Sequence, residues 1–213
     1  MNLDYSDKGK LKIDMKYYVD NMDEEFPYGI KPVTTAQWNE KLFKVVESAE
    51  PVNEEKKAIF HTYVMKAMFL CKRARPDIEP AVSYLSTRTT KSDENDWGKL
   101  LRTLGFLKGT RDDILTLEAD DTQTLTWYVD AAFVVHPDMK SHTGMVFTLG
   151  KGVIISSSTK QKVNARSSTE SELIASDDEL GKILSTKTFM EHQDFKVKVN
   201  LIYQDNSKNE ITN

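Results

Sequence analysis

The chain has 213 residues, a net charge of −4, 39% hydrophobic and 29% charged residues, a balance typical of a soluble globular protein rather than a disordered one. It has no apolar run near the roughly 18 residues of a membrane helix and no apolar signal-peptide core, and its single cysteine, Cys71, excludes an internal disulfide. We therefore expect an intracellular protein that is not secreted, does not bind membranes and is no general polyanion binder.

The first half of the chain is predicted to be mostly helical after an N-terminal hairpin. Residues 1–15 alternate around a polar turn, which is typical of a hairpin. Three later segments have the apolar spacing of helices, namely residues 17–26, 56–86 and 97–109. Pro27 ends the first, Pro76 interrupts the second and Gly109 ends the third. Residues 30–55 are expected to form a loose connection.

The second half is predicted to have the order β-β-β-α-β. Its predicted elements are strands at 125–133, 143–150 and 152–161, a helix at 167–192 and a strand at 196–206. The Gly150-Lys151-Gly152 turn indicates an antiparallel hairpin between the second and third strands. The helical crossover predicts a parallel pairing of the last strand with an earlier one. The fold class is therefore α/β in this half and α+β overall.

Two strands of this arrangement end in aspartates. Asp130 stands in the apolar run TWYVDAAF, and Asp205 ends the last strand. Taken alone, Asp130 indicates the end of a strand, but parallel pairing would bring the two aspartates together, with a glutamate of the helix above them. Converging carboxylates repel one another unless a cation lies between them. Hard oxygen ligands without nearby cysteine or histidine favour Mg²⁺ or Mn²⁺, and two such ions cleave phosphodiesters.

A basic strip lies between Met139 and Thr169, where the sequence has no acidic residue. Its five positive charges are Lys140, Lys151, Lys160, Lys162 and Arg166. The strip is either a nucleic-acid-binding surface that contacts a phosphate backbone or the solvated face of a hairpin.

Several linked motifs resemble a known family. YVDAAF, HPDMKSHTGMVFTLGKGVIISSSTKQ, SSTESELIA and IYQDNS are similar to the ribonuclease H domain of copia-type LTR retrotransposon polyproteins. The preceding helices resemble the reverse transcriptase thumb and connection. The resemblance implies three parts: residues 1–28 as the palm-end hairpin and first thumb helix, residues 29–118 as the thumb and connection, and residues 119–213 as an incomplete ribonuclease H-like domain.

The resemblance also implies an activity, namely two-metal hydrolysis of the RNA strand of RNA–DNA hybrids. Asp130, Glu172 and Asp205 match the catalytic and metal-binding positions of the family. Glu170 is a rival to Glu172, and the two side chains point about 200° apart on a helix. Either glutamate could form a capping box, Glu170 with Ser167 or Glu172 with Thr169. Only the family pattern favours Glu172.

The resemblance is incomplete in ways that affect the expected activity. The 213 residues contain no polymerase YxDD motif, and the family's fifth strand, final helix and fourth aspartate should lie beyond Asn213. We therefore expect an unprotected edge on the last strand and weak or absent nuclease activity in the isolated chain. The alternative is a non-catalytic retroelement remnant with a structural or weak nucleic-acid-binding role. The implied partners are an RNA–DNA hybrid and the remaining polyprotein, in a cytoplasmic particle or the nucleus.

Overall fold

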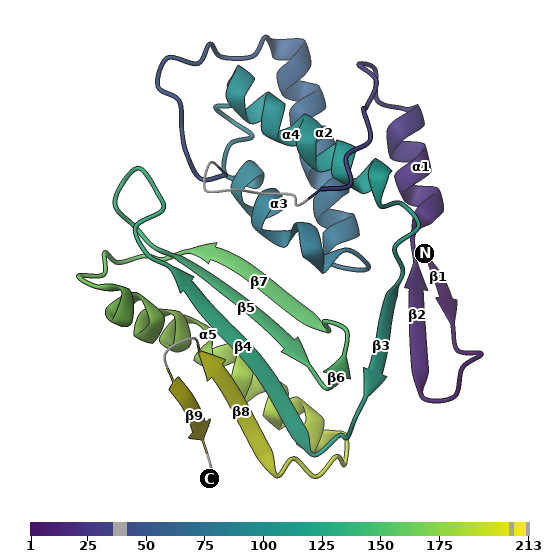
Figure 1. Ribbon diagram of the computed structural model, residues 1–213, viewed down its shortest axis with the longest axis vertical. Helices are drawn as coiled ribbons and strands as arrows, with labels where there is room; N and C mark the ends of the chain where they lie inside the picture. The colour runs from purple at the N-terminus through teal and green to yellow at the C-terminus, as the bar shows by residue number, and fades with distance from the viewer. Residues whose placement is uncertain (36–41, 205–206, 212–213) are drawn as a thin grey trace. The chain divides into compact units, whose positions relative to one another are not determined.

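The computed structural model describes residues 1–35, 42–204 and 207–211, the last range for its backbone only. The chain forms two compact units, one of Met1–Leu3 with Ile13–Leu115 and the other of Asp4–Lys12 with Thr116–Asn213. Figure 1 displays the helices and strands of both units, which make the fold α+β overall. Most of the predicted N-terminal hairpin is grouped with the second unit.

The first unit is a helical bundle with its own hydrophobic core. Its elements are α1 (Lys16–Glu24), α2 (Glu54–Cys71), the short 3₁₀ helix η1 (Pro76–Ile78), α3 (Glu79–Ser86) and α4 (Glu94–Gly109). The Asn53 side chain caps α2, and Asp93 with Asp96 forms a capping box on α4. The predicted break at Pro76 and end at Gly109 are confirmed. The helical first half is only partly confirmed, because residues 25–35 and 42–53 form no helix.

The second unit contains a mixed five-stranded sheet. Its strands are β4 (Thr124–Ala132), β5 (His142–Thr148), β7 (Ile155–Lys160), β8 (Val199–Gln204) and β9 (Ser207–Ile211), in the order β7-β5-β4-β8-β9. The β4–β8 pair is parallel, as predicted, and the other pairs are antiparallel. The helix α5 (Ser168–His192) connects β7 to β8 and lies along one face of the sheet (Figure 1).

Apolar residues at alternate positions of β4 hold the sheet against α5. Leu125, Trp127 and Val129 are buried together with Ala175 and Ile183 of the helix. Residues between them on β4 point to the opposite face, because successive side chains of a strand alternate. Asp130 therefore lies on the face that α5 does not cover.

One prediction about the sheets is wrong, and another is confirmed only in part. The predicted unprotected edge on β8 is wrong, because the backbone of β9 pairs with β8 from Gln204–Ser207 to Asn200–Ile211. The predicted antiparallel hairpin of β5 with β7 is confirmed, but its Gly150–Gly152 connection is partly a strand, β6 (Gly150–Lys151), which pairs with β3 (Leu115–Ala119). A two-residue strand has no alternation that a sequence pattern can detect, so only the tertiary pairing reveals it.

A second, four-stranded sheet has the order β1-β2-β3-β6, where β1 is Asn2–Asp4 and β2 is Lys10–Asp14. Gly152, directly after β6, has a φ of +81°, and a Cβ there would lie 2.2 Å from the Thr116 carbonyl oxygen. The close approach to β3 therefore requires glycine. None of the helices in the described ranges is long and apolar enough to cross a membrane.

Candidate active site

Asp130 lies near the end of β4 and is exposed. Its Oδ1 accepts a hydrogen bond of 2.9 Å from the backbone N–H of Ala131. Because the carboxylate remains in contact with solvent, its charge does not carry the cost of burial. The apolar run around Asp130 is thus explained by strand alternation, with one face buried and the other open.

Glu172 approaches the same point from α5. Its side chain is buried, with 8% of its surface exposed, and its Oε1 accepts a hydrogen bond of 3.3 Å from the Ala131 N–H. One N–H therefore holds an oxygen of each carboxylate, Asp130 and Glu172. Carboxylates that share one donor in this way could also share a cation, which would offset repulsion between their charges.

Glu170 has a different role in the structure. The Ser167 side chain accepts a hydrogen bond from Glu170 N, and Glu170 Oε2 accepts one of 2.6 Å from Arg166 N. The helix cap is thus formed by Ser167 with Glu170, and Glu172 is the glutamate that reaches the end of β4.

Asp205 lies outside the described residues. The parallel register of β4 and β8 runs as far as the Tyr128–Tyr203 pair, two residues before each aspartate. In the described ranges, which exclude Asp205, no group of three acidic, histidine or cysteine side chains is arranged to hold a metal ion. The described part of the candidate site is therefore the pair Asp130 and Glu172.

A histidine pair that sequence reasoning gave no role lies at the same end of the sheet. His142 pairs in register with Ala132 on β4, and its ring nitrogens lie 2.9 Å from His136 Nε2 and 2.6 Å from Ser158 Oγ. Burial, and secondarily the neighbouring His136, lowers the pKa of His142 to about 4. Burial also lowers the pKa of His136. Both rings are consequently neutral near pH 7.

The predicted basic strip is divided between the two ends of the sheet. Lys160 pairs in register with His142, at the same end of the sheet as Asp130, and its Nζ lies 2.6 Å from Asp138. Lys140, Lys162 and Arg166 flank the same end of β5 and β7 in the sequence, and Lys162 and Arg166 are exposed. Lys151 follows the opposite end of β5, where it pairs with Glu118 of β3.

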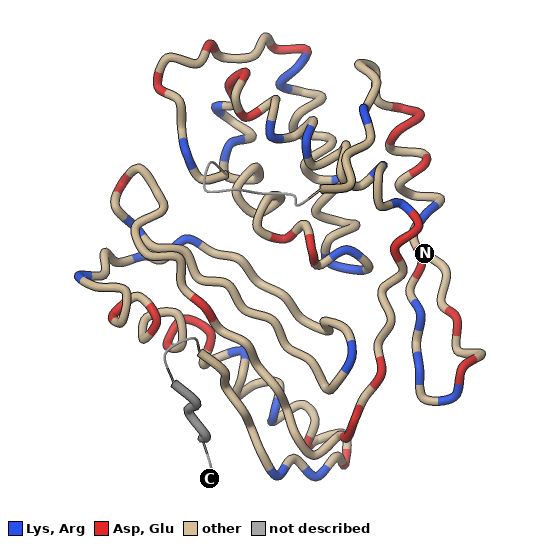
Figure 2. Tube along the Cα trace, viewed as in Figure 1, with Lys and Arg blue, Asp and Glu red and all other residues tan. Residues whose placement is uncertain are grey.

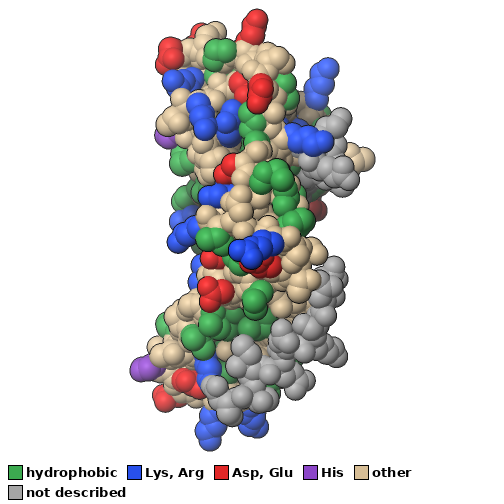
Figure 3. Space-filling view, turned by 90° about the vertical axis from the view of Figure 1, so that its left-hand side faces the viewer, with side chains coloured by type: hydrophobic (Ala, Val, Ile, Leu, Met, Phe, Trp, Pro, Cys, Tyr) green, Lys and Arg blue, Asp and Glu red, His purple; other side chains and the backbone are tan. Residues whose placement is uncertain are grey.

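The charges do not form one continuous patch. Figure 2 shows acidic residues along the N-terminal part of α5, close in sequence to the basic ones. The face in Figure 3 likewise has Lys and Arg side chains interspersed with acidic and hydrophobic ones. Any contact with a phosphate backbone would therefore be made by separate side chains.

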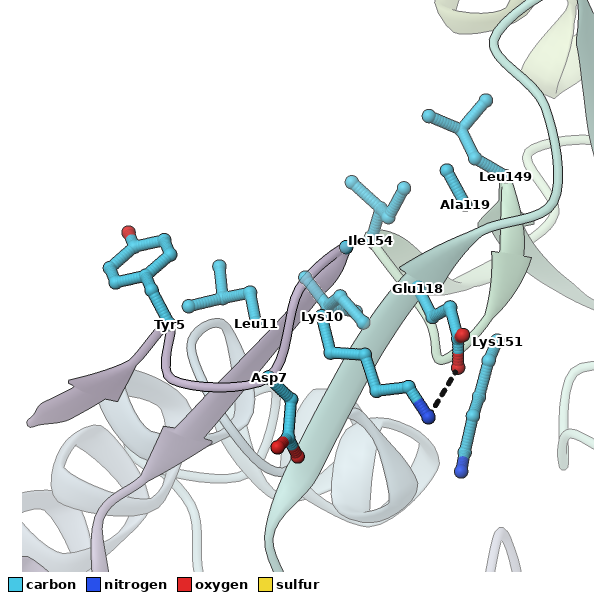
Figure 4. A pocket seen from close by; sticks show the side chains of 11 residues that line it. Tyr5, Asp7, Lys10, Leu11, Glu118, Ala119, Leu149, Lys151 and Ile154 are labelled. Carbon is cyan, nitrogen blue, oxygen red and sulfur yellow. Dashed lines mark ion pairs between the residues drawn. The ribbon is translucent and has the colours of Figure 1, made fainter.

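A surface cleft of about 380 Å³ lies on the four-stranded sheet (Figure 4). Tyr5, Leu11 and Ile154 contribute apolar walls, and Lys10 forms an ion pair of 3.3 Å with Glu118. Among the candidate residues that the structure describes, the cleft contains Lys151 and neither Asp130 nor Glu172. The cleft is therefore separate from the candidate active site.

The fold and the paired carboxylates define an α+β protein with an acidic site at the end of a parallel strand pair. The chain is 29% identical over 201 residues to a retrovirus-related Pol polyprotein from transposon TNT 1-94 of Nicotiana tabacum, covering 92% of this chain and 15% of that protein. It is 38% identical over 99 residues to the corresponding polyprotein from transposon RE2 of Arabidopsis thaliana, covering 46% of this chain and 7% of that protein.

A third relative is the secreted RxLR effector protein 161 of Plasmopara viticola, 33% identical over 109 residues, which cover 51% of this chain and 77% of that protein. The chain belongs to the same family as this relative, and its similarity to the transposon proteins supports a fragment of a retrotransposon Pol polyprotein. No family model and no solved structure matches the chain.

Proposed function

We propose that the chain is a fragment of a copia-type retrotransposon reverse transcriptase/ribonuclease H polyprotein, and that its ribonuclease H-like residues 119–213 contribute to metal-dependent cleavage of the RNA strand of RNA–DNA hybrids. The observation that carries this proposal is the shared N–H of Ala131, which holds one oxygen each of Asp130 and Glu172. Paired carboxylates at the end of parallel strands are suited to a divalent cation and a phosphodiester.

The residues present fit Mg²⁺ or Mn²⁺, because both described ligands are carboxylates, the donors that these hard cations prefer. Asp130 and Glu172 would hold the ion, with Asp205 as the proposed third ligand. When bound, the ion supplies Lewis-acid activation of water and stabilises the leaving oxygen. Asp130 is open to solvent and could meet a substrate phosphate, whereas the buried Glu172 is held in one orientation.

The substrate proposal depends on the basic residues at the Asp130 end of the sheet. Lys140, Lys160, Lys162 and Arg166 would contact phosphates, which gives affinity without sequence preference. Discrimination of RNA from DNA would come from contacts with 2′-hydroxyl groups and from the shape of the hybrid. The remaining polyprotein is the second proposed partner.

The test is cleavage of a labelled RNA–DNA hybrid with Mg²⁺, using the chain and a longer version that continues into its flanking reading frame. We expect Asp130→Asn and Glu172→Gln to abolish cleavage, because each keeps its side-chain size but removes an anionic metal ligand. Glu170→Gln is the matched control, since glutamine also serves in a capping box, and it should cleave like the unsubstituted protein.

Full cleavage by Asp130→Asn would reject the metal site. Hybrid binding without cleavage in both unsubstituted versions would instead favour the non-catalytic alternative. If the 213-residue chain lacks a part of the domain that catalysis needs, only the longer version should cleave the hybrid. If the protein has no catalytic function, neither version should cleave it.

A further inference from the structure

Two glutamine side chains hold the start of α5 to the sheet. Gln161 follows β7 and is almost completely buried, with 1% of its surface exposed. Its Nε2 donates to Ser171 O at 2.8 Å and to Thr143 Oγ1 at 3.1 Å. Gln204 ends β8, and its Nε2 donates to Glu172 O at 2.8 Å. The two carbonyl groups that receive these bonds are consecutive along the helix.

The two glutamines approach the helix from both sides of the central strands. In the sheet order β7-β5-β4-β8, Gln161 follows the strand at one side and Gln204 ends the strand at the other, with β5 and β4 between them. Their bonds therefore fix the first turns of α5 above β4. The Glu172 carboxylate reaches the Ala131 N–H from that position.

The Gln161 amide uses its donor group and leaves its acceptor unpaired. Its Oε1 is buried and has no hydrogen-bond partner among the described residues. An unpaired buried acceptor is destabilising, so the contribution of this side chain comes from the two bonds that its Nε2 donates. One of these bonds goes to the residue directly before Glu172.

We propose that Gln161 is a positioning residue that sets the Glu172 carboxylate beside Asp130, an inference that rests on the proposed metal-dependent function. Gln161 touches neither substrate nor metal in this role. It acts through the Ser171 carbonyl, and Gln204 supports the same helical turn from β8. Loss of the amide lets the first turns of α5 move relative to β4, so that the two carboxylates no longer share one N–H.

The test compares Gln161→Met, which keeps the length of the side chain but removes the donor, with Gln193→Met, a substitution at the exposed C-cap of the same helix. Mn²⁺ alone is the probe, and its affinity is measured by calorimetry. We expect about tenfold weaker binding in Gln161→Met, the usual size of an effect transmitted through a ligand's supporting bond, and no change in Gln193→Met. The Ala131 amide resonance should shift in Gln161→Met without any metal present.

A double-mutant cycle separates positioning from general destabilisation. In a Glu172→Gln background, Gln161→Met should weaken Mn²⁺ binding no further, because the side chain that it positions is already changed. If Gln161→Met does not fold, Thr143→Val replaces it, since this near-isosteric change removes one acceptor of the amide, and a smaller loss in the same direction is expected.

The outcomes distinguish this inference from the proposed function. Failure of the unsubstituted protein to bind Mn²⁺ overturns both. Normal binding by the unsubstituted protein with unchanged affinity and an unchanged Ala131 resonance in Gln161→Met overturns the positioning role alone. Equal losses from Gln161→Met in the Glu172 and Glu172→Gln backgrounds also overturn it, because the effect would not pass through Glu172.

Discussion

The environments of single side chains at the end of β4 differ sharply over a short distance. Asp130 is exposed, Glu172 is buried, and both bind the Ala131 N–H. An exposed carboxylate stays available to a ligand, whereas a buried one has a fixed orientation because packing restricts its rotamers. The nearby His142 is also buried, but its burial favours a neutral ring.

His142 should make folding stability depend on pH. Its pKa is lowered to about 4 in the folded protein, below the ordinary value of about 6.5 in the unfolded chain. Between these two pKa values the unfolded chain binds more protons than the folded protein. The contribution of His142 to folding stability is therefore fully present above about pH 6.5 and is lost as the pH drops toward 4. The loss should reach roughly 3 kcal/mol at the lower end of this window.

Urea unfolding at about pH 7.5 and about pH 4.5 measures this loss. His142→Gln should show a clearly smaller difference between the two conditions, whereas His61→Gln, on the exposed side of α2, should match the unsubstituted protein. His136, which contacts His142, is present in both variants. Nearby Lys160 lowers the pKa of His136 and Asp138 raises it, and these two residues are also unchanged in both variants. An equal pH dependence in His142→Gln would show that other groups cause it.

At the scale of elements, a close backbone approach determines where β6 lies, and side-chain caps determine where α5 begins. The β6 segment lies against β3 because glycines at positions 150 and 152 leave space for the neighbouring carbonyl groups. The helix α5 begins where the Ser167 hydroxyl accepts a hydrogen bond from the Glu170 N–H of the first turn and the Glu170 carboxylate accepts one from the Arg166 N–H just before the helix. Both features depend on particular residues rather than on average propensity.

Gly152→Ala should therefore destabilise the second unit. The new Cβ would meet the Thr116 carbonyl oxygen at 2.2 Å, and the φ of +81° is unfavourable for alanine, so a cost of at least about 1–3 kcal/mol is expected. Gly181→Ala is the control, because a Cβ at this helical position meets nothing within 4 Å and should stabilise by about 0.5–1 kcal/mol. Thermal unfolding measures both, and equal stability of the two variants would contradict the close approach.

At the scale of the whole molecule, a net charge of −4 coexists with basic side chains at one end of a sheet. A polyanion would be repelled at long range and attracted only locally, and salt screens both effects. Lys162 and Lys151 lie at opposite ends of the sheet. Replacing either lysine by glutamine changes the net charge by the same amount, so a difference between the two variants reports the local attraction alone.

Binding of an RNA–DNA hybrid should weaken steeply as salt increases, since each phosphate contact releases counterions. Lys162→Gln should reduce the slope of log affinity against log salt by about 1, whereas Lys151→Gln should leave it almost unchanged. Fluorescence anisotropy across a salt series gives both slopes. If Lys151→Gln reduced the salt slope as much as Lys162→Gln does, the position of the charge at the Asp130 end of the sheet would not matter for hybrid binding.

The sequence alone predicted the elements whose patterns are long. The α2 and α4 helices, the strands β4, β5, β7 and β8, and the parallel return of β8 through α5 were all predictable, because apolar periodicity and a helical crossover are local signals. The same patterns suggested Asp130 as a strand-end carboxylate. The position of Asp205 remains a prediction.

The tertiary structure decided what depends on contacts between distant residues. Sequence spacing did not decide whether Glu170 or Glu172 reaches the end of β4. In the structure, Glu170 accepts a hydrogen bond at the start of the helix, and Glu172 accepts one from the Ala131 N–H. The β6–β3 pairing, the addition of β9 and the separation of Lys151 from Lys160 likewise had no local pattern. These features depend on which backbone and side-chain groups meet after folding, and a residue's own neighbours in the sequence carry little information about such meetings.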